Sequence, residues 1–215
     1  ILNDGLKTQW GKSLYEMGSE DNIAKYLNLT LTRYLIISST VWAFITVYIK
    51  EILFILTPIK FHEAHLIVPI VSLAYMVMGI GTIFSAVLHL QRKAKSFWII
   101  SSFAAVLNII LNFIFIPKYG MFAASITTAI AFSTQPICYF WISKKYYNIN
   151  LPYSKILLLI ISLATLYIFS IFLSNEVFIL SLFMKTILFA VFLVFIFFSK
   201  IISDSDRIAL INVVK

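Results

Sequence analysis

Two asparagines four residues apart are the polar residues whose spacing is most suggestive of chemistry. Asn108 and Asn112 share one face of a helix inside a long apolar run. An amide at such a position either hydrogen-bonds a neighbouring helix or lines a hydrated cavity, and the spacing leaves both open. Gln135 in the next apolar run adds a third amide. Arg33, near the start of the first run, either reaches the membrane surface or attracts an anionic group into a cavity. We predict these four residues as candidates for lining a substrate cavity.

Catalytic and metal-binding patterns are missing from the sequence. His62-Glu63-Ala64-His65 is similar to the HExxH motif of metalloproteases, but its histidines are three residues apart and the motif requires four. The acidic residues, Glu51 among them, stand at or beyond the ends of the apolar runs, so the usual membrane-embedded proton relay is not expected. A single cysteine, Cys138, allows no disulfide within the chain. The sequence therefore predicts no catalytic residue, no metal and no cofactor, and a protein that is not an enzyme.

The elements that must position these residues are six apolar runs. Each has about 18–23 residues, and a helix needs about 20 to cross a hydrocarbon core about 30 Å thick. Apolar residues make up 61% of the chain and charged residues 12%, against about 45–50% and about 25% in soluble domains. We predict an all-α, polytopic helical membrane protein. The runs are 29–49, 66–88, 97–116, 121–142, 156–173 and 178–199, with a cytoplasmic connection and helix start at 1–28 and a cytoplasmic tail at 200–215.

The basic residues predict which way the runs cross. If the runs alternate, one side holds 13 of the 17 Lys and Arg residues, and the other holds four, at Lys50, Lys60, Lys118 and Lys185. Since cytoplasmic loops collect Lys and Arg, both ends of the chain are expected in the cytoplasm. The net charge of +8 then reflects topology and contact with membrane lipids, and no nucleic-acid partner is expected. Lys185, about seven residues into the last run, either extends to the headgroups or marks a later start of that span.

Glycine and proline mark a turn and three candidate hinges. Pro117 and Gly120 separate the third and fourth runs and predict a tight antiparallel hairpin on the outer side. Pro136 lacks a backbone donor and predicts a kink, which serves either as a hinge or as a static bend. Gly79 and Gly81, in the middle of the second run, are the other hinge candidates. Small residues recur every four positions on the fourth run and allow close helix approach, at Ser125, Ala129 and Ser133.

The segment from Val106 to Thr128 resembles a hairpin signature, N-xxx-N…P-x-x-G…A-A-x-x-T. Its residues here are Asn108, Asn112, Pro117, Gly120, Ala123, Ala124 and Thr127. This pattern is similar to that of polysaccharide (O-antigen, Wzx-type) flippases of the multidrug/oligosaccharidyl-lipid/polysaccharide exporter superfamily. The basic loop from His89 to Lys95 and the pair Lys144-Lys145 fit the same layout. The sequence departs from the family at Phe122, where a second glycine is usual.

The resemblance implies the C-terminal lobe of a MATE-like, two-lobe transporter in the bacterial inner membrane. Its expected substrate is an undecaprenyl-diphosphate-linked oligosaccharide, moved between leaflets by alternating access for surface polysaccharide synthesis. Its expected partners are membrane lipids and an N-terminal lobe of the same protein. The chain opens at Ile1 without an initiator Met, so we expect that lobe to lie upstream of it. Two alternatives stay open: a cation-coupled exporter of small solutes or drugs from the same superfamily, and a membrane-embedded polysaccharide polymerase or acyltransferase.

Overall fold

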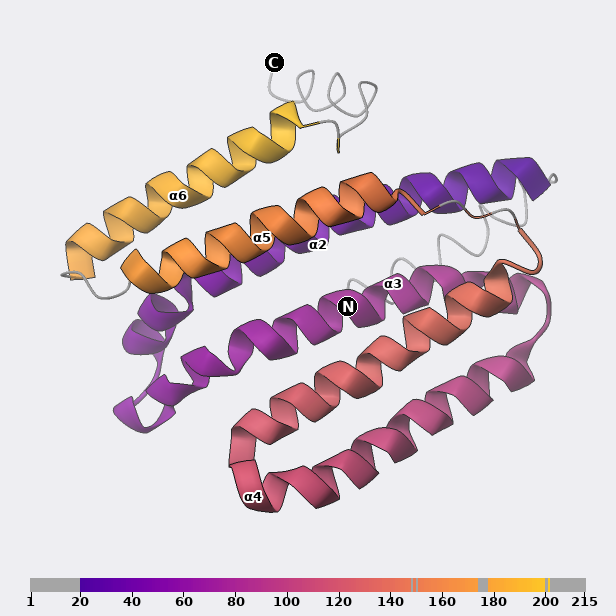
Figure 1. Cartoon of the computed structure of the whole chain (residues 1–215), viewed down its shortest axis with the longest axis horizontal. Coiled ribbons are helices and arrows are strands. Elements are labelled where there is room, and N and C mark those ends of the chain that lie inside the picture. The colour runs from indigo at the N-terminus through magenta and orange to yellow at the C-terminus, as the bar shows by residue number, and fades with distance from the viewer. Residues whose placement is uncertain (1–19, 148, 150, 174–177, 200, 202–215) are drawn as a thin grey trace. The chain divides into compact units, whose positions relative to one another are not determined.

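The computed structural model describes residues 20–147, 149, 151–173, 178–199 and 201, and every regular element in that part of the chain is helical (Figure 1). The all-α prediction is confirmed. The helix α2 begins at Glu20, within the segment 1–28 for which the sequence predicted a helix start. The elements are α2 (Glu20–Leu56), the 3-10 helix η1 (Ile59–Leu66), α3 (Val68–Leu90), α4 (Ala94–Ser143), α5 (Tyr153–Leu173) and α6 (Phe178–Phe198).

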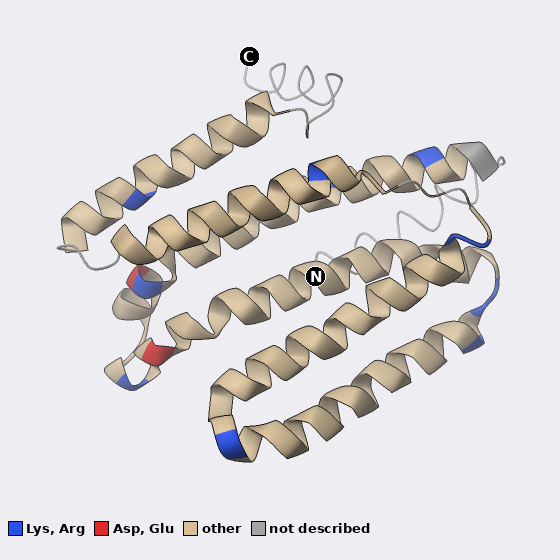
Figure 2. Cartoon of the chain, in the orientation of Figure 1, with Lys and Arg blue, Asp and Glu red and all other residues tan. Residues whose placement is uncertain are grey.

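Five helices in the described part of the chain are long and apolar enough to cross a membrane. They correspond to the six predicted runs because the third and fourth runs are two arms of α4, which doubles back on itself (Figure 1). Long stretches of helix carry no charge, and the Lys and Arg residues of the described chain are few and scattered, both along the helices and in the connections (Figure 2). The protein is therefore a multi-pass, helical membrane protein, as its composition predicted.

The reversal of α4 occurs at Gly120, within the predicted turn. Gly120 has φ 58° and ψ −139°, the non-helical backbone position within this 50-residue helix. Residues with a Cβ rarely adopt this conformation, whereas glycine adopts it readily. A built Cβ on Gly120 meets no atom within 4 Å, so the requirement for glycine comes from the backbone and not from packing. The tight hairpin predicted at Pro117 and Gly120 is confirmed.

The first of two compact units comprises residues 1–31 and 66–151. It contains the first part of α2 and the whole of α3 and α4. In this unit α3 runs parallel to the second arm of α4. Their rings meet at Tyr75 and Phe132, 5.3 Å between centroids, and at Phe84 and Phe140, also 5.3 Å. Near the end of the contact, the buried hydroxyl of Ser143 donates to the carbonyl oxygen of Phe84 at 2.9 Å.

The second unit comprises residues 32–65 and 152–215, and includes the rest of α2, η1, α5 and α6. Here α2 and α6 run antiparallel along an aromatic contact. The ring centroids of Phe44 and Phe189 are 5.8 Å apart, and those of Phe54 and Phe178 are 5.5 Å apart. Helix α5 contacts α2 through Tyr167, whose ring lies 6.4 Å from that of Trp42.

Candidate functional site

The two asparagines predicted from the sequence form a polar cluster inside the α4 hairpin. Asn112 Nδ2 donates to Asn108 Oδ1 at 2.9 Å. From the second arm, the buried hydroxyl of Thr127 donates to Asn112 Oδ1, with the carbonyl oxygen of Ala123 at 3.0 Å as an alternative acceptor. We call Asn108, Asn112 and Thr127 the amide cluster. It connects the two arms, so Asn112 is placed as the helix–helix alternative requires.

The amide cluster leaves one donor without a partner. Asn108 Nδ2 is buried from solvent and makes no hydrogen bond in the described structure. An unsatisfied buried donor costs about 1–3 kcal/mol, so an oxygen that reached this amide nitrogen would stabilise the cluster. A carbonyl, hydroxyl or water oxygen would satisfy it.

Two of the predicted hinge residues contact each other. Gly81 of α3 is buried against Pro136 in the second arm of α4, and a Cβ built on Gly81 would lie 3.2 Å from the Pro136 nitrogen. A methyl group would therefore press on backbone atoms that cannot move independently. Gly79 is buried in the same helix. Dihedral angles in α4 stay helical through Pro136, so this proline does not interrupt the helix.

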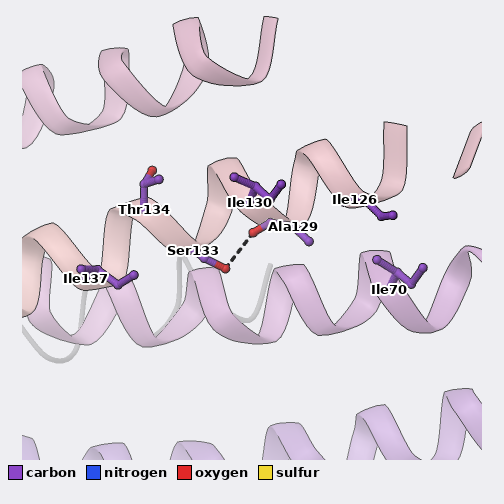
Figure 3. Close-up of a pocket in the computed structure, with 7 residues that line it drawn as sticks. All are labelled: Ile70, Ile126, Ala129, Ile130, Ser133, Thr134 and Ile137. Atoms are coloured by element: carbon purple, nitrogen blue, oxygen red, sulfur yellow. Dashed lines mark hydrogen bonds between the residues drawn. The ribbon is translucent and has the colours of Figure 1, made fainter. Parts of the chain in front are cut away.

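An open, apolar depression lies between α3 and the second arm of α4 (Figure 3). Its volume is about 650 Å³. The hydroxyl of Ser133 donates to the carbonyl oxygen of Ala129 at 2.7 Å, and Thr134 donates to Ala131 at 2.7 Å, so neither offers a free donor. The lining is Ile70, Ile126, Ala129, Ile130, Ser133, Thr134 and Ile137.

A smaller depression of about 320 Å³ lies near the hairpin turn and includes Thr127 in its lining. None of the four predicted cavity residues lines either depression. Gln135 is half-buried beside Pro136, and Arg33 is exposed on α2 in the other unit. The structure thus brings Asn108 and Asn112 together and adds Thr127 to them, while Gln135 and Arg33 are not part of this cluster.

The second unit contains a buried ion pair that the sequence analysis missed. Lys185 Nζ of α6 donates to Glu51 Oε1 of α2 at 2.6 Å. Lys185 is 1% exposed and Glu51 is 7% exposed. Ser181 Oγ lies 3.4 Å from the same oxygen, whereas the other carboxylate oxygen, Oε2, is buried and has no hydrogen-bond partner in the described structure.

The position of Glu51 corrects the expectation that this acid stands at the end of its span. The first predicted run ends at residue 49, and the charged residues Lys50 and Glu51 directly follow it. However, α2 continues through five more apolar residues to Leu56, so Glu51 lies within the helix. Lys185 likewise lies within its helix, which begins at Phe178, and its side chain is buried against Glu51. Two opposite charges, each inside a long apolar helix, were the signal that could have indicated the pair.

The histidines of the metalloprotease-like segment lie in η1 and contact backbone oxygens. His65 Nδ1 is 2.8 Å from the His62 carbonyl oxygen, and His62 Nε2 is 3.2 Å from that of Thr57. Among the described residues, no group of three or more His, Cys, Asp or Glu side chains is arranged to hold a metal ion.

The comparisons with known proteins give no family for this chain: no family model, curated protein or solved structure matches it. The fold therefore defines the class of protein, an all-α, multi-pass membrane protein, and the polar clusters within its helices are the basis for the functional proposals.

Proposed function

We propose that this chain forms the C-terminal lobe of a flippase that moves undecaprenyl-diphosphate-linked oligosaccharide across the bacterial inner membrane, for surface polysaccharide synthesis. The observation that carries the proposal is the amide cluster. Three polar residues of the flippase-like signature meet across the turn at Gly120, with Asn112 bonded to Thr127 fifteen residues later. The signature thus describes one three-dimensional unit, and the sequence around it is the part that resembles the family.

The features of the first unit suit the two parts of such a substrate. The depression between α3 and α4 has an isoleucine-rich lining whose hydroxyls are satisfied within their own helix, which suits a polyprenyl chain better than a sugar. The free N–H of Asn108 suits a sugar hydroxyl. The contact of Gly81 with Pro136 would allow the two helices to move as one body. Arg33 remains our candidate for diphosphate attraction. The distribution of Lys and Arg favours a cytoplasmic position for both ends of the chain.

A second candidate function is favoured by Glu51. A cation-coupled exporter of small solutes requires a carboxylate at membrane depth, and Glu51 is a buried carboxylate within a helix long and apolar enough to cross a membrane. Its ion pair with Lys185 weakens this alternative, because the ammonium group occupies the position that a coupling cation would take.

The experiment that tests the flippase is the double substitution Asn108→Leu/Asn112→Leu in the full-length protein, expressed in cells that lack their own flippase. We expect loss of surface glycan with normal membrane insertion, because the free amide donor and the cluster are both removed. Ser101→Ala is the matched control: it removes another hydrogen bond between the arms, to Tyr139 at 2.8 Å, and leaves the amides intact.

Glycan display at the wild-type level in the double variant would remove both asparagines from the site. If the wild-type protein itself fails to restore glycan in any such strain but does export cationic dyes, the exporter becomes the better assignment.

A further inference from the structure

Lys185 and Glu51 stand in the middle of an apolar contact between α2 and α6. On α6 the contacting or buried residues recur at spacings of three and four, so they form one face of the helix. The facing stripe on α2 is aromatic on both sides of Glu51. We call this contact the α2–α6 seam: Phe44, Tyr48, Glu51 and Phe54 on α2, and Phe178, Ser181, Lys185, Phe189 and Phe192 on α6.

The charge of Lys185 is tolerated in the seam because Glu51 is there. Taking an ammonium group out of water is expensive, and a close carboxylate offsets that penalty only while the carboxylate is ionised. The other nearby contacts are neutral. Ser181 donates toward Glu51, and Tyr48 donates to Thr186 at 3.1 Å, one residue beyond Lys185.

Glu51 has an oxygen that can take a proton. Oε1 accepts both Lys185 and Ser181, while Oε2 is buried and unpartnered. A proton on Oε2 displaces no existing hydrogen bond. It nevertheless changes the net charge of the pair from zero to +1 and leaves the Lys185 ammonium without a counter-ion.

The burial of Lys185 links the loss of the ion pair to a movement of α6. Lys185 lies seven residues after the start of α6 at Phe178, about 10 Å along the helix axis. Lys185 is 1% exposed, so without its counter-ion the ammonium group leaves its buried position only if its side chain or α6 shifts relative to α2.

We propose that Glu51 and Lys185 form a proton-operated latch between α2 and α6. With Glu51 ionised, the ion pair fixes the register of the two helices. When a proton from water reaches Oε2, an O–H bond forms, the ion pair is lost, and α6 is no longer held in that register against α2. The latch does not depend on the substrate and therefore holds for either function considered above.

The charged and titratable groups around Glu51 are few. On α2 its neighbours are Lys50 and Tyr48, and α6 presents Lys185. Helix α5 carries Lys155 in its first turn, bonded to the carbonyl oxygen of Ile201 at 2.9 Å, and Tyr167, whose ring contacts Trp42. Beyond the end of α2, η1 adds His62, whose ring lies 5.8 Å from that of Phe54. The residues of η1 that can carry charge are Lys60, His62, Glu63 and His65.

The test measures the distance between α2 and α6 as a function of pH. Spin labels are placed at Leu56→Cys and Ile179→Cys, which are 74% and 78% exposed, in the full-length protein carrying Cys138→Ser. Pulsed electron–electron resonance in lipid nanodiscs then gives the distance distribution. For wild-type Glu51 we expect one narrow distribution at neutral pH and a shifted, broader one in acid. Glu51→Gln should show the acid-type distribution at neutral pH.

The matched control is Glu51→Gln/Lys185→Gln, which replaces the ion pair by two amides able to hydrogen-bond each other without titrating. Its distribution should stay narrow at both pH values. A wild-type distribution that stays constant while the protein remains folded would overturn the latch and leave a fixed ion pair. A pH response that persists in the double variant would also overturn it, and would point to His62.

Discussion

The α4 hairpin and the α2–α6 seam each contain one small polar cluster in an otherwise apolar contact between helices. The two clusters differ in charge and in how far apart their residues lie in the sequence. The hairpin uses neutral amides and a hydroxyl, with Asn112 and Thr127 15 residues apart. The seam uses full charges on residues 134 apart. A neutral cluster tolerates an unsatisfied group, as Asn108 Nδ2 shows, whereas an unpaired charge in the same surroundings is far more costly.

The two clusters illustrate two roles of polar residues within membrane helices. The amide cluster closes a local hairpin that the turn at Gly120 already brings together, so each hydrogen bond contributes modestly. The ion pair joins helices that nothing local connects, and it permits one register, because any shift of α6 separates Lys185 from Glu51. A buried charge pair therefore specifies helix position more strongly than it adds stability.

The largest effect that separates the two regions is expected from Glu51→Leu. Lys185 then keeps its charge at 1% exposure without a partner, and we expect the free energy of unfolding to fall by about 3–5 kcal/mol. Glu51→Leu/Lys185→Leu should recover most of that loss, because an apolar pair fits the seam. Unfolding in mixed detergent micelles measures both values. Lys50→Leu, which changes the adjacent and more exposed charge, is the control and should stay within about 0.5 kcal/mol of wild type.

If Glu51→Leu were as stable as wild type, the ion pair would contribute nothing to the seam, and the contrast with the amide cluster would be lost.

An intermediate effect is expected at the turn of the hairpin. Gly120→Ala forces a residue with a Cβ to adopt φ 58° and ψ −139°, which costs about 1–3 kcal/mol. The loss comes from the backbone alone, since a Cβ there has nothing within 4 Å. The same unfolding measurement applies, with the exposed neighbour substitution Met121→Ala as the control. A loss no greater than that of Met121→Ala would show that the turn can relax into a conformation open to alanine.

The sequence was sufficient to predict the hairpin and the shared helix face of Asn108 and Asn112, because these residues lie within one short segment. Proline and glycine marked the turn, the four-residue spacing placed Asn108 beside Asn112, and hydropathy marked both arms. Thr127 stood in the quoted signature but was not recognised as the partner of Asn112, since the pairing depends on the register of the arms about Gly120.

The seam could not be predicted in the same way. Periodicity shows which face of α6 is apolar, but it does not show which helix covers that face, and Glu51 and Lys185 are brought together only by the packing of remote helices. Hydropathy also ended the first run too early. The helix α2 has 37 residues, and its polar first turns and the Lys50-Glu51 pair lie outside the apolar stretch that the prediction used.

The smallest effect is expected from the hydrogen bond within the amide cluster. In a double-mutant cycle of Asn112→Leu and Thr127→Val, the coupling energy should be about 0.6 kcal/mol and no more than about 1.7, because membrane-embedded hydrogen bonds between helices rarely exceed this range. Ser101→Ala paired with Thr127→Val gives the control cycle, since Ser101 bonds Tyr139 and not Thr127; its coupling should be zero within error. A coupling of about 3 kcal/mol or more in the first cycle would make the neutral cluster as strong as the ion pair. The difference between the two regions would then lie in the sequence separation of their paired residues and not in their charge.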